Sequence, residues 1–168
     1  MGNSFIDTIA PLVRKYPSKI FNSVTIAQAC LESAFGQSDL ARGGRNLFGI
    51  KASAPWTGPV FNKDSLEERA GVLKPENSDF RSYGTVSYTH LRAHETVLSA
   101  STPEEQAEAL TGTYATDSRY GQKLIDFINK YGLKEYDEER GEDKVTIAYP
   151  KIINETLMNV GPMGTILG

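Results

Sequence analysis

A break in helical periodicity is the feature that most constrains the fold of this chain. Residues 24–35 and 118–131 both repeat apolar side chains with a helical period, and both are predicted to be helices. Between them, residues 43–83 lose that period and are rich in Gly, Pro, Asn and Asp, which indicates loops around a short β-hairpin. The sequence therefore predicts an α+β fold that is mainly α, with a small β-hairpin lobe.

The two patterned helices have recognisable ends. The first is expected to be capped by Ser23, and its buried face follows i, i+3, i+4, i+7 spacing: Ala27, Cys30, Leu31 and Ala34. The second is expected to open at Asp117 or Ser118 and to end at Gly132. Its apolar stripe consists of Tyr120, Leu124, Phe127, Ile128 and Tyr131.

Further helices are predicted outside these two patterns. Residues 3–15 are amphipathic, with Ser4 as the expected N-cap, although an internal proline weakens the pattern. Thr102 precedes a proline at the first helical position, and Glu105 completes a capping box. Residues 86–98 are predicted to be helical, although their pattern is weak.

Length and composition exclude several classes of protein. The 168 residues suit one domain, and we expect that domain to span residues 1–136, with a linker or truncated tail over 137–168. A net charge of −3 argues against a nucleic-acid partner, and there is no apolar run long enough for a membrane span. No signal peptide is apparent, so synthesis in the cytoplasm is expected.

Glu32 is the strongest candidate for acid catalysis. It lies near the end of a predicted helix, beside the apolar face and on the same flank as Gln28, and small residues follow it. Such a position can be half-buried, and burial raises the pKa of a carboxyl group toward the working pH of a general acid. Glycosidic cleavage needs such an acid to protonate the leaving oxygen. From spacing alone, a solvated glutamate on a helix flank is the competing interpretation.

Four ordered blocks resemble glycoside hydrolase family 73. Segments 23–38 and 46–51 are similar to its patterns Gln-x-x-x-Glu-Ser-x-x-Gly-x-Ser and Asn-x-Phe-Gly-Ile-Lys. Segments 79–83 and 114–120 are similar to its Phe-Arg-x-Tyr strand and its Tyr-Ala-Thr-Asp-x-x-Tyr block. The matching residues of the first two blocks are Gln28, Glu32, Ser33, Gly36, Ser38, Asn46, Phe48, Gly49, Ile50 and Lys51. The likeness covers about residues 4–136.

This resemblance implies both a fold and an activity. The fold would be lysozyme-like, with the hairpin lobe flanking a substrate groove. The activity would be hydrolysis of the β-1,4 bond on the reducing side of N-acetylglucosamine in peptidoglycan, with Glu32 at the general-acid position. The family's members act on peptidoglycan glycan strands without a cofactor, as autolysins, flagellar hydrolases and phage lysins. We expect a monomer that acts on the bacterial cell wall.

The resemblance places a second carboxylate in the hairpin. Glu67 stands four residues before Gly71, which fits the family pattern Glu-Tyr-x-x-Gly, although residue 68 is Glu rather than an aromatic. Glu68 and Asp64 are rival candidates, and an exposed charged hairpin is the plain alternative.

Several residues are candidates for substrate binding. Tyr114 matches a tyrosine that lies in the family's groove, and Gln28 belongs to the catalytic-helix motif. Phe48 is expected to form a wall of the cleft or part of the core. Trp56 is expected to stack on a sugar face or to pack locally, and Asn46 to bind sugar or to satisfy a turn.

The region between Tyr83 and Tyr114 departs from the family pattern. It is shorter by about a helical turn or more, and Ala93 replaces the aspartate of the family's Asp-His pair beside His94. Residues 86–96 also resemble translated sequencing-adapter sequence and would then not be evolved protein. His90 and His94 have i, i+4 spacing but lack a third ligand, so no metal site is predicted.

Two other functions remain open from the sequence. A muramidase or a lytic transglycosylase on the same fold would cut the alternate bond. A non-catalytic wall-binding or phage structural module would bind the wall without releasing sugar, a role against which the intact Glu32 argues.

Overall fold

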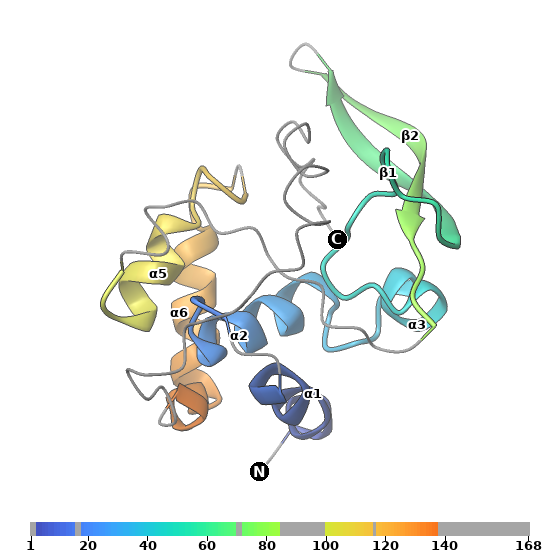
Figure 1. Ribbon diagram of the computed structural model, residues 1–168. Coiled ribbons are helices and arrows are strands. Elements are labelled where there is room, and N and C mark those ends of the chain that lie inside the picture. Colours follow the sequence, from blue (N-terminus) through green and yellow to red (C-terminus); the bar gives the residue numbers. More distant parts are fainter. Residues whose placement is uncertain (1–2, 16–17, 70–71, 85–99, 116, 138–168) are drawn as a thin grey trace.

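The computed structural model gives the architecture of most of the chain (Figure 1). It describes residues 3–15, 18–69, 72–84, 100–115 and 117–137, with the backbone alone for 66–69 and 72–73. The described elements are α1 (Ser4–Lys15), α2 (Asn22–Glu32), α3 (Asp39–Gly44), β1 (Val60–Arg69), β2 (Val72–Arg81), α5 (Pro103–Ala109), α6 (Tyr120–Lys130) and the 3-10 helix η1 (Leu133–Asp137). The predicted α+β, mainly helical class is confirmed.

Helix α2 forms the centre of the helical body. It packs against α1, α5, α6 and η1, whereas the β1–β2 hairpin contacts α3 and projects to one side (Figure 1). Every α2 residue from Ser23 to Cys30 is buried, because neighbours cover the helix on all sides. The predicted single buried face is therefore only part of the buried surface of this helix.

The start of α2 differs from the prediction, because Ser23 is not its N-cap. The helix begins at Asn22, and the N-cap position belongs to Phe21, which has no polar side chain to offer. Instead, Asp137 Oδ1 accepts a 2.9 Å hydrogen bond from the Ser23 N–H across 114 residues of sequence. A carboxylate at this end satisfies a free backbone donor and complements the helix dipole. The N-terminus of α2 is therefore capped by a residue that is distant in the sequence and close only in the folded structure.

The end of α2 also differs from the prediction. The helix stops at Glu32, and Ala34 and Phe35 have positive φ angles of 50° and 55°, followed by Gly36 at 76°. Ala34 is exposed, so its assignment to the buried face was wrong. The turn buries part of the Phe35 ring, which stacks on Phe127 with ring centroids 5.5 Å apart. Aromatic packing of this kind offsets the strain of left-handed backbone.

The remaining helix ends are local. Thr102 Oγ1 accepts from the Glu105 N–H at 3.2 Å, which confirms the predicted start of α5. Helix α1 spans its predicted residues, but its first turn is capped by Asn3, whose Oδ1 accepts from the Phe5 N–H at 3.0 Å; the expected Ser4 cap was wrong. Helix α6 begins at Tyr120, after a turn that Asp117 closes by accepting from the Arg119 N–H.

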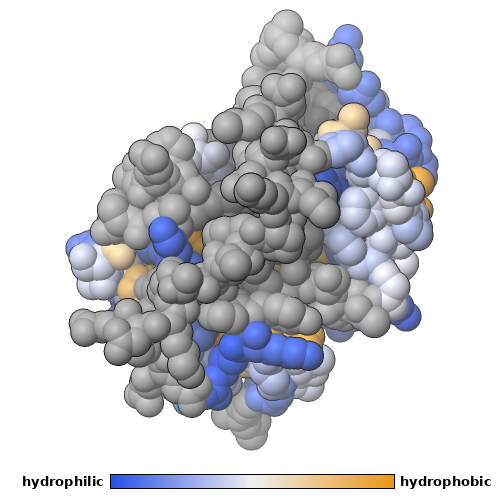
Figure 2. Space-filling view, viewed as in Figure 1, coloured by the Kyte–Doolittle hydropathy of each residue, from blue (hydrophilic) through white to orange (hydrophobic). Residues whose placement is uncertain are grey.

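The predicted hairpin is present and is longer than expected. Strands β1 and β2 have 10 residues each and pair antiparallel from Val60↔Arg81 to Arg69↔Val72. Its base is anchored by Phe80, which is buried, and by Phe61, which packs against the glycines of α3. The face of the hairpin seen in Figure 2 is mostly hydrophilic. The anchored base fixes where the lobe leaves the helical body.

Some predictions fall outside the described residues. The weak helix at 86–98, the two histidines, the segment 86–96 and the tail 138–168 are among these. Within the described part of the chain, no helix has the length and apolarity needed to span a membrane.

Candidate active site

Glu32 is the last residue of α2, and most of its side chain is enclosed. Burial raises the pKa of its carboxyl group, and a hydrogen bond from Tyr120 partly opposes that rise. The cause of the rise is that a buried carboxylate loses its hydration, which favours the protonated form. A carboxylic acid that keeps its proton at higher pH is suited to general-acid catalysis.

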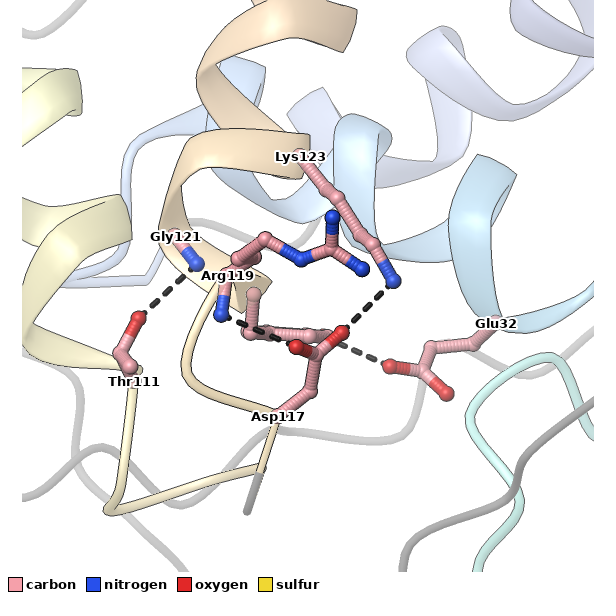
Figure 3. A network of polar contacts seen from close by, with 7 residues as sticks. Glu32, Thr111, Asp117, Arg119, Gly121 and Lys123 are labelled. Atoms are coloured by element: carbon pink, nitrogen blue, oxygen red, sulfur yellow. Dashed lines mark hydrogen bonds and ion pairs between the residues drawn. The ribbon is translucent and has the colours of Figure 1, made fainter.

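Tyr120 brings helix α6 to the carboxyl group of Glu32. Its hydroxyl donates to Glu32 Oε1 at 2.6 Å, the dashed line that ends at Glu32 in Figure 3. The same hydroxyl accepts from Gln28 Nε2 at 3.3 Å. Gln28 is fully buried, and Tyr120 is 4% exposed. One phenol therefore joins two side chains that lie one turn apart on α2.

Tyr114 stands beside this pair. Its ring centroid is 5.5 Å from that of Tyr120, and its side chain is partly buried against the core. Burial, and then the negative charge of Glu32, raise the pKa of Tyr114, so its hydroxyl stays protonated. Tyr114 is therefore close to Glu32 and remains a hydrogen-bond donor.

The turn after Glu32 is tied by the hydroxyl of Ser33. This hydroxyl donates to the Ala29 carbonyl at 2.5 Å and accepts from the Gly36 N–H at 2.8 Å. The Ser33 carbonyl in turn accepts from the Ser38 N–H at 2.9 Å. The Ser38 hydroxyl accepts from the Ala41 N–H at 3.2 Å and caps α3. The two serine hydroxyls of the motif thus hold the turn after Glu32 and the start of the next helix.

Asn46 and Phe48 lie in the second motif block, and both are buried. The Asn46 amide donates to the carbonyls of Ile50 and Arg81 at 2.8 and 3.0 Å, and its oxygen accepts from the Ile50 N–H at 3.0 Å. This arrangement fits the turn-closing role of Asn46 and joins the loop to the end of β2. Phe48 is 3% exposed and belongs to the hydrophobic core.

Trp56 is only partly buried and sits in a small cluster at the base of the hairpin. Its indole N–H donates to the Pro59 carbonyl at 3.1 Å, and its ring meets Tyr83 edge-on at 5.7 Å. The Arg81 guanidinium lies 4.9 Å from the ring centroid. These contacts correspond to the local-packing interpretation of Trp56.

Of the three candidate carboxylates in the hairpin, the structure describes the side chain of Asp64. Asp64 is exposed, and its Oδ1 accepts from Asn77 Nδ2 across the hairpin at 2.8 Å. The backbone of Glu67 pairs with Lys74, and that of Glu68 with Leu73, near the tip of the hairpin. The side chains of Glu67 and Glu68 lie outside the described part of the structure.

Asp117 lies in the turn that leads into α6. Asp117 accepts from the Arg119 N–H at 2.9 Å and forms a 2.6 Å ion pair with Lys123 (Figure 3). The hydrogen bond from Lys123 holds the pKa of Asp117 below its ordinary value. Asp117 is thus an ionised residue that fixes the turn leading into Tyr120.

The profile of a glucosaminidase family, described as "Mannosyl-glycoprotein endo-beta-N-acetylglucosaminidase", matches residues 13–133. The chain belongs to this glucosaminidase family. The match includes Glu32, Tyr114 and Tyr120, and it confirms the resemblance to glycoside hydrolase family 73.

Individual members of the glucosaminidase family are similar along most of this chain. Exo-glucosaminidase LytG of Bacillus subtilis (strain 168) is 35% identical over 153 residues, which cover 80% of this chain and 53% of LytG. A probable N-acetylmuramidase of Lactococcus lactis subsp. cremoris (strain MG1363) is 33% identical over 159 residues, 79% of this chain and 34% of the relative. The chain thus spans about half or less of these two relatives.

A solved structure shares the fold. The catalytic domain of the autolysin Auto from Listeria monocytogenes superposes with a TM-score of 0.68 at 29% identity, covering 80% of this chain and 86% of that domain. The described fold is therefore that of a catalytic domain of this family.

The sequence did not single out Tyr120 as a site residue. It was assigned to the apolar stripe of its helix, and it does pack in the core. The available signal was its position as the last residue of the Tyr-Ala-Thr-Asp-x-x-Tyr block.

Proposed function

We propose that this chain hydrolyses the β-1,4 bond on the reducing side of N-acetylglucosamine in peptidoglycan, with Glu32 as general acid. The observation that carries the proposal is the enclosed Glu32 carboxyl with a raised pKa, at the end of a helix that bears the family's motif. Membership of the glucosaminidase family supports this choice of bond. The site of action would be the bacterial cell wall.

The proposed mechanism uses Glu32 to protonate the glycosidic oxygen as the bond breaks. The transition state resembles an oxocarbenium ion, and its positive charge is quenched either by water directly or by the N-acetyl group of the substrate. The first route needs a second carboxylate as base, for which Glu67 is our candidate, with Glu68 and Asp64 as rivals. The stereochemistry of the product distinguishes the two routes. Direct attack by water inverts the configuration of the anomeric carbon, whereas assistance by the N-acetyl group retains it.

The proposed substrate site extends from Glu32 toward the hairpin in a lysozyme-like arrangement. Tyr114 is its best-supported binding residue, because it lies against Tyr120 and keeps its proton. Trp56 at the hairpin base is a second candidate for contact with sugar, since it is only partly buried. Asn46 and Phe48 would support the site from within rather than touch the glycan.

The test is wall hydrolysis by the full chain and by two variants. Glu32→Gln keeps the size of the side chain and removes the proton, and we expect activity to fall about 10²- to 10⁴-fold. Glu108→Gln makes the same change at an exposed residue and should leave activity unchanged. Full activity in a folded Glu32→Gln protein would refute the assignment.

A second candidate is cleavage of the alternate bond by a muramidase, favoured by the similarity to the lactococcal protein of that name. Mass spectrometry of the digested wall separates the possibilities. A reducing-end N-acetylglucosamine supports our proposal, a reducing-end N-acetylmuramic acid identifies a muramidase, and an anhydro-muramic product identifies a lytic transglycosylase. Wall binding without release of sugar would indicate a non-catalytic module.

A further inference from the structure

The hydroxyl of Tyr120 is held between Gln28 and Glu32, two residues of the same helix. Side chains four residues apart on a helix lie on the same face, one turn from each other. Tyr120 reaches this face from α6, accepting from Gln28 Nε2 at 3.3 Å and donating to Glu32 Oε1 at 2.6 Å. The three side chains form a directional chain of two hydrogen bonds.

The direction of this chain follows from the number of protons available. A phenol hydroxyl can donate only one hydrogen bond, and Tyr120 donates it to Glu32. The atom of Gln28 that faces Tyr120 must therefore be a donor. The amide nitrogen meets that requirement. The opposite atom, Gln28 Oε1, is buried and has no hydrogen-bond partner among the described residues. Leaving a buried oxygen without a hydrogen bond lowers the stability of the folded protein. The orientation of the Gln28 amide therefore favours the hydrogen bond to Tyr120 at the expense of one for Oε1.

The chain also determines which oxygen of the protonated Glu32 carries the acid proton. In a neutral carboxyl group, the carbonyl oxygen accepts hydrogen bonds better than the hydroxyl oxygen. Oε1 accepts from Tyr120, so it is the carbonyl oxygen and the proton resides on Oε2. Oε2 is then the atom that presents the proton to the substrate.

We propose that Gln28 is a positioning residue that acts through Tyr120 to confine the acid proton of Glu32 to Oε2. This inference rests on the proposed role of Glu32 as general acid. It gives Gln28 a role different from substrate binding, because its side chain is fully buried. Gln28 acts on the acid without touching the glycan.

Several other titratable groups on α2, on α6 and in the connection before α6 are neutral or paired with each other. Tyr114 adjoins Tyr120 from the connection before α6 and is neutral, because burial and the charge of Glu32 raise its pKa. Lys123 of α6 and Asp117 are paired with each other. Cys30 of α2 is a neutral thiol, since burial raises its pKa to about 12. The Tyr120 hydrogen bond is therefore the main interaction that a local substitution would remove.

The experiment measures the titration of the Glu32 carboxyl by carbon NMR, with the resonance assigned from Glu32→Gln. Tyr120→Phe removes the donor, and the midpoint should rise by about one pH unit, the scale of one charge-assisted hydrogen bond. Gln28→Met is close in size and lacks the amide, so it should raise the midpoint in the same direction by a smaller amount. The double variant should shift no further than Tyr120→Phe.

Gln106→Met is the matched control. Gln106 is also a fully buried glutamine, but its amide bonds the Lys19 carbonyl and the Phe21 N–H, at the other end of α2 from Glu32. We expect it to lower stability and to leave the Glu32 midpoint unchanged. If Gln28→Met does not fold, Gln28→Asn, whose amide is one methylene too short to reach Tyr120, should give the same shift.

Wall hydrolysis by the same proteins completes the test. Gln28→Met should lower kcat severalfold without changing KM, and the alkaline limb of its pH profile should move upward with the NMR midpoint. A midpoint in Gln28→Met equal to that in Gln106→Met would overturn the inference, as would fully additive shifts in the double variant. A wild-type protein that does not cleave the wall refutes the proposed function instead, and the NMR titration still reports on the chain of hydrogen bonds.

Discussion

The hydroxyl of Tyr120 donates a 2.6 Å hydrogen bond to Glu32, although the two residues are 88 positions apart in the sequence. The bond connects the end of α2 to the first residue of α6. It is also short, as hydrogen bonds to a carboxyl group often are. The candidate acid is thereby placed by the packing of two helices, and its environment depends on both.

Removing the titratable group of Glu32 should stabilise the protein in a pH-dependent way. Burial raises the pKa of Glu32 above its ordinary 4.5, so between 4.5 and the folded-state pKa the folded chain binds more protons than the unfolded chain. Stability linked to this group is present below 4.5 and is lost as pH rises through the folded-state pKa. Glu32→Gln avoids that loss and still accepts from Tyr120. We expect the free energy of unfolding to rise by about 0.5–2 kcal/mol at neutral pH, the usual range for a substitution that removes a destabilising feature of an active site.

The measurement for Glu32→Gln is denaturant unfolding at several pH values. The stability difference from wild type should be largest at neutral pH and should vanish below pH 4.5. A difference that is constant across this range would mean that burial of the charge is not the cause.

The left-handed turn after Glu32 should respond in opposite ways to two small substitutions. A Cβ on Gly36 would lie 2.8 Å from Phe5 Cδ2, and the φ of Gly36 is +76°. We expect Gly36→Ala to cost about 1–3 kcal/mol through overpacking and strain. Ala34 is exposed with φ 50°, so Ala34→Gly should be neutral or stabilise by up to about 1 kcal/mol. Thermal unfolding of both variants tests the contrast; equal destabilisation would contradict it.

Asp137 should contribute to the stability of α2 as a cap from a distant part of the chain. Its carboxylate accepts from the Ser23 N–H, and replacing a capping residue with Ala costs about 1 kcal/mol. Asp137→Ala should therefore lower the midpoint of urea unfolding. Glu135→Ala, at an exposed position of the same 3-10 helix, is the control and should change stability by less than about 0.5 kcal/mol. Equal effects of the two variants would exclude the cap.

The second carboxylate is tested by three variants of the hairpin. We expect Glu67→Gln to slow turnover more than Glu68→Gln or Asp64→Asn, because Glu67 fits the family spacing and Asp64 is engaged with Asn77. Initial rates of wall hydrolysis provide the comparison. If a neighbour proves more damaging, the assignment moves to that residue. If all three variants match wild type, Glu32 is the only one of these four carboxylates that the reaction requires.

The sequence determined the features that depend on local chemistry. The start of α5 was predicted because Thr102 and Glu105 satisfy the backbone donors within one turn of their own helix. The hairpin was predicted because loss of the helical period is visible in any window of residues 43–83. Glu32 was identified because its motif is contiguous in the sequence, running from the last turn of α2 through the turn that follows.

Tertiary structure decided the features in which distant segments supply the missing partner. The start of α2 depends on Asp137, and no local pattern around Ser23 contains that information. The end of α2 at Glu32 depends on the stacking of Phe35 on Phe127. This aromatic contact offsets the strain of a left-handed turn that the local sequence disfavours. The role of Tyr120 depends on both α2 and α6. Its place in the apolar stripe of α6 predicts a ring in the core, but only the packing of α6 on α2 brings its hydroxyl to Glu32. Hydrogen bonds between distant residues form only after packing has fixed both ends, and for that reason the sequence located the candidate acid but not the groups that hold it.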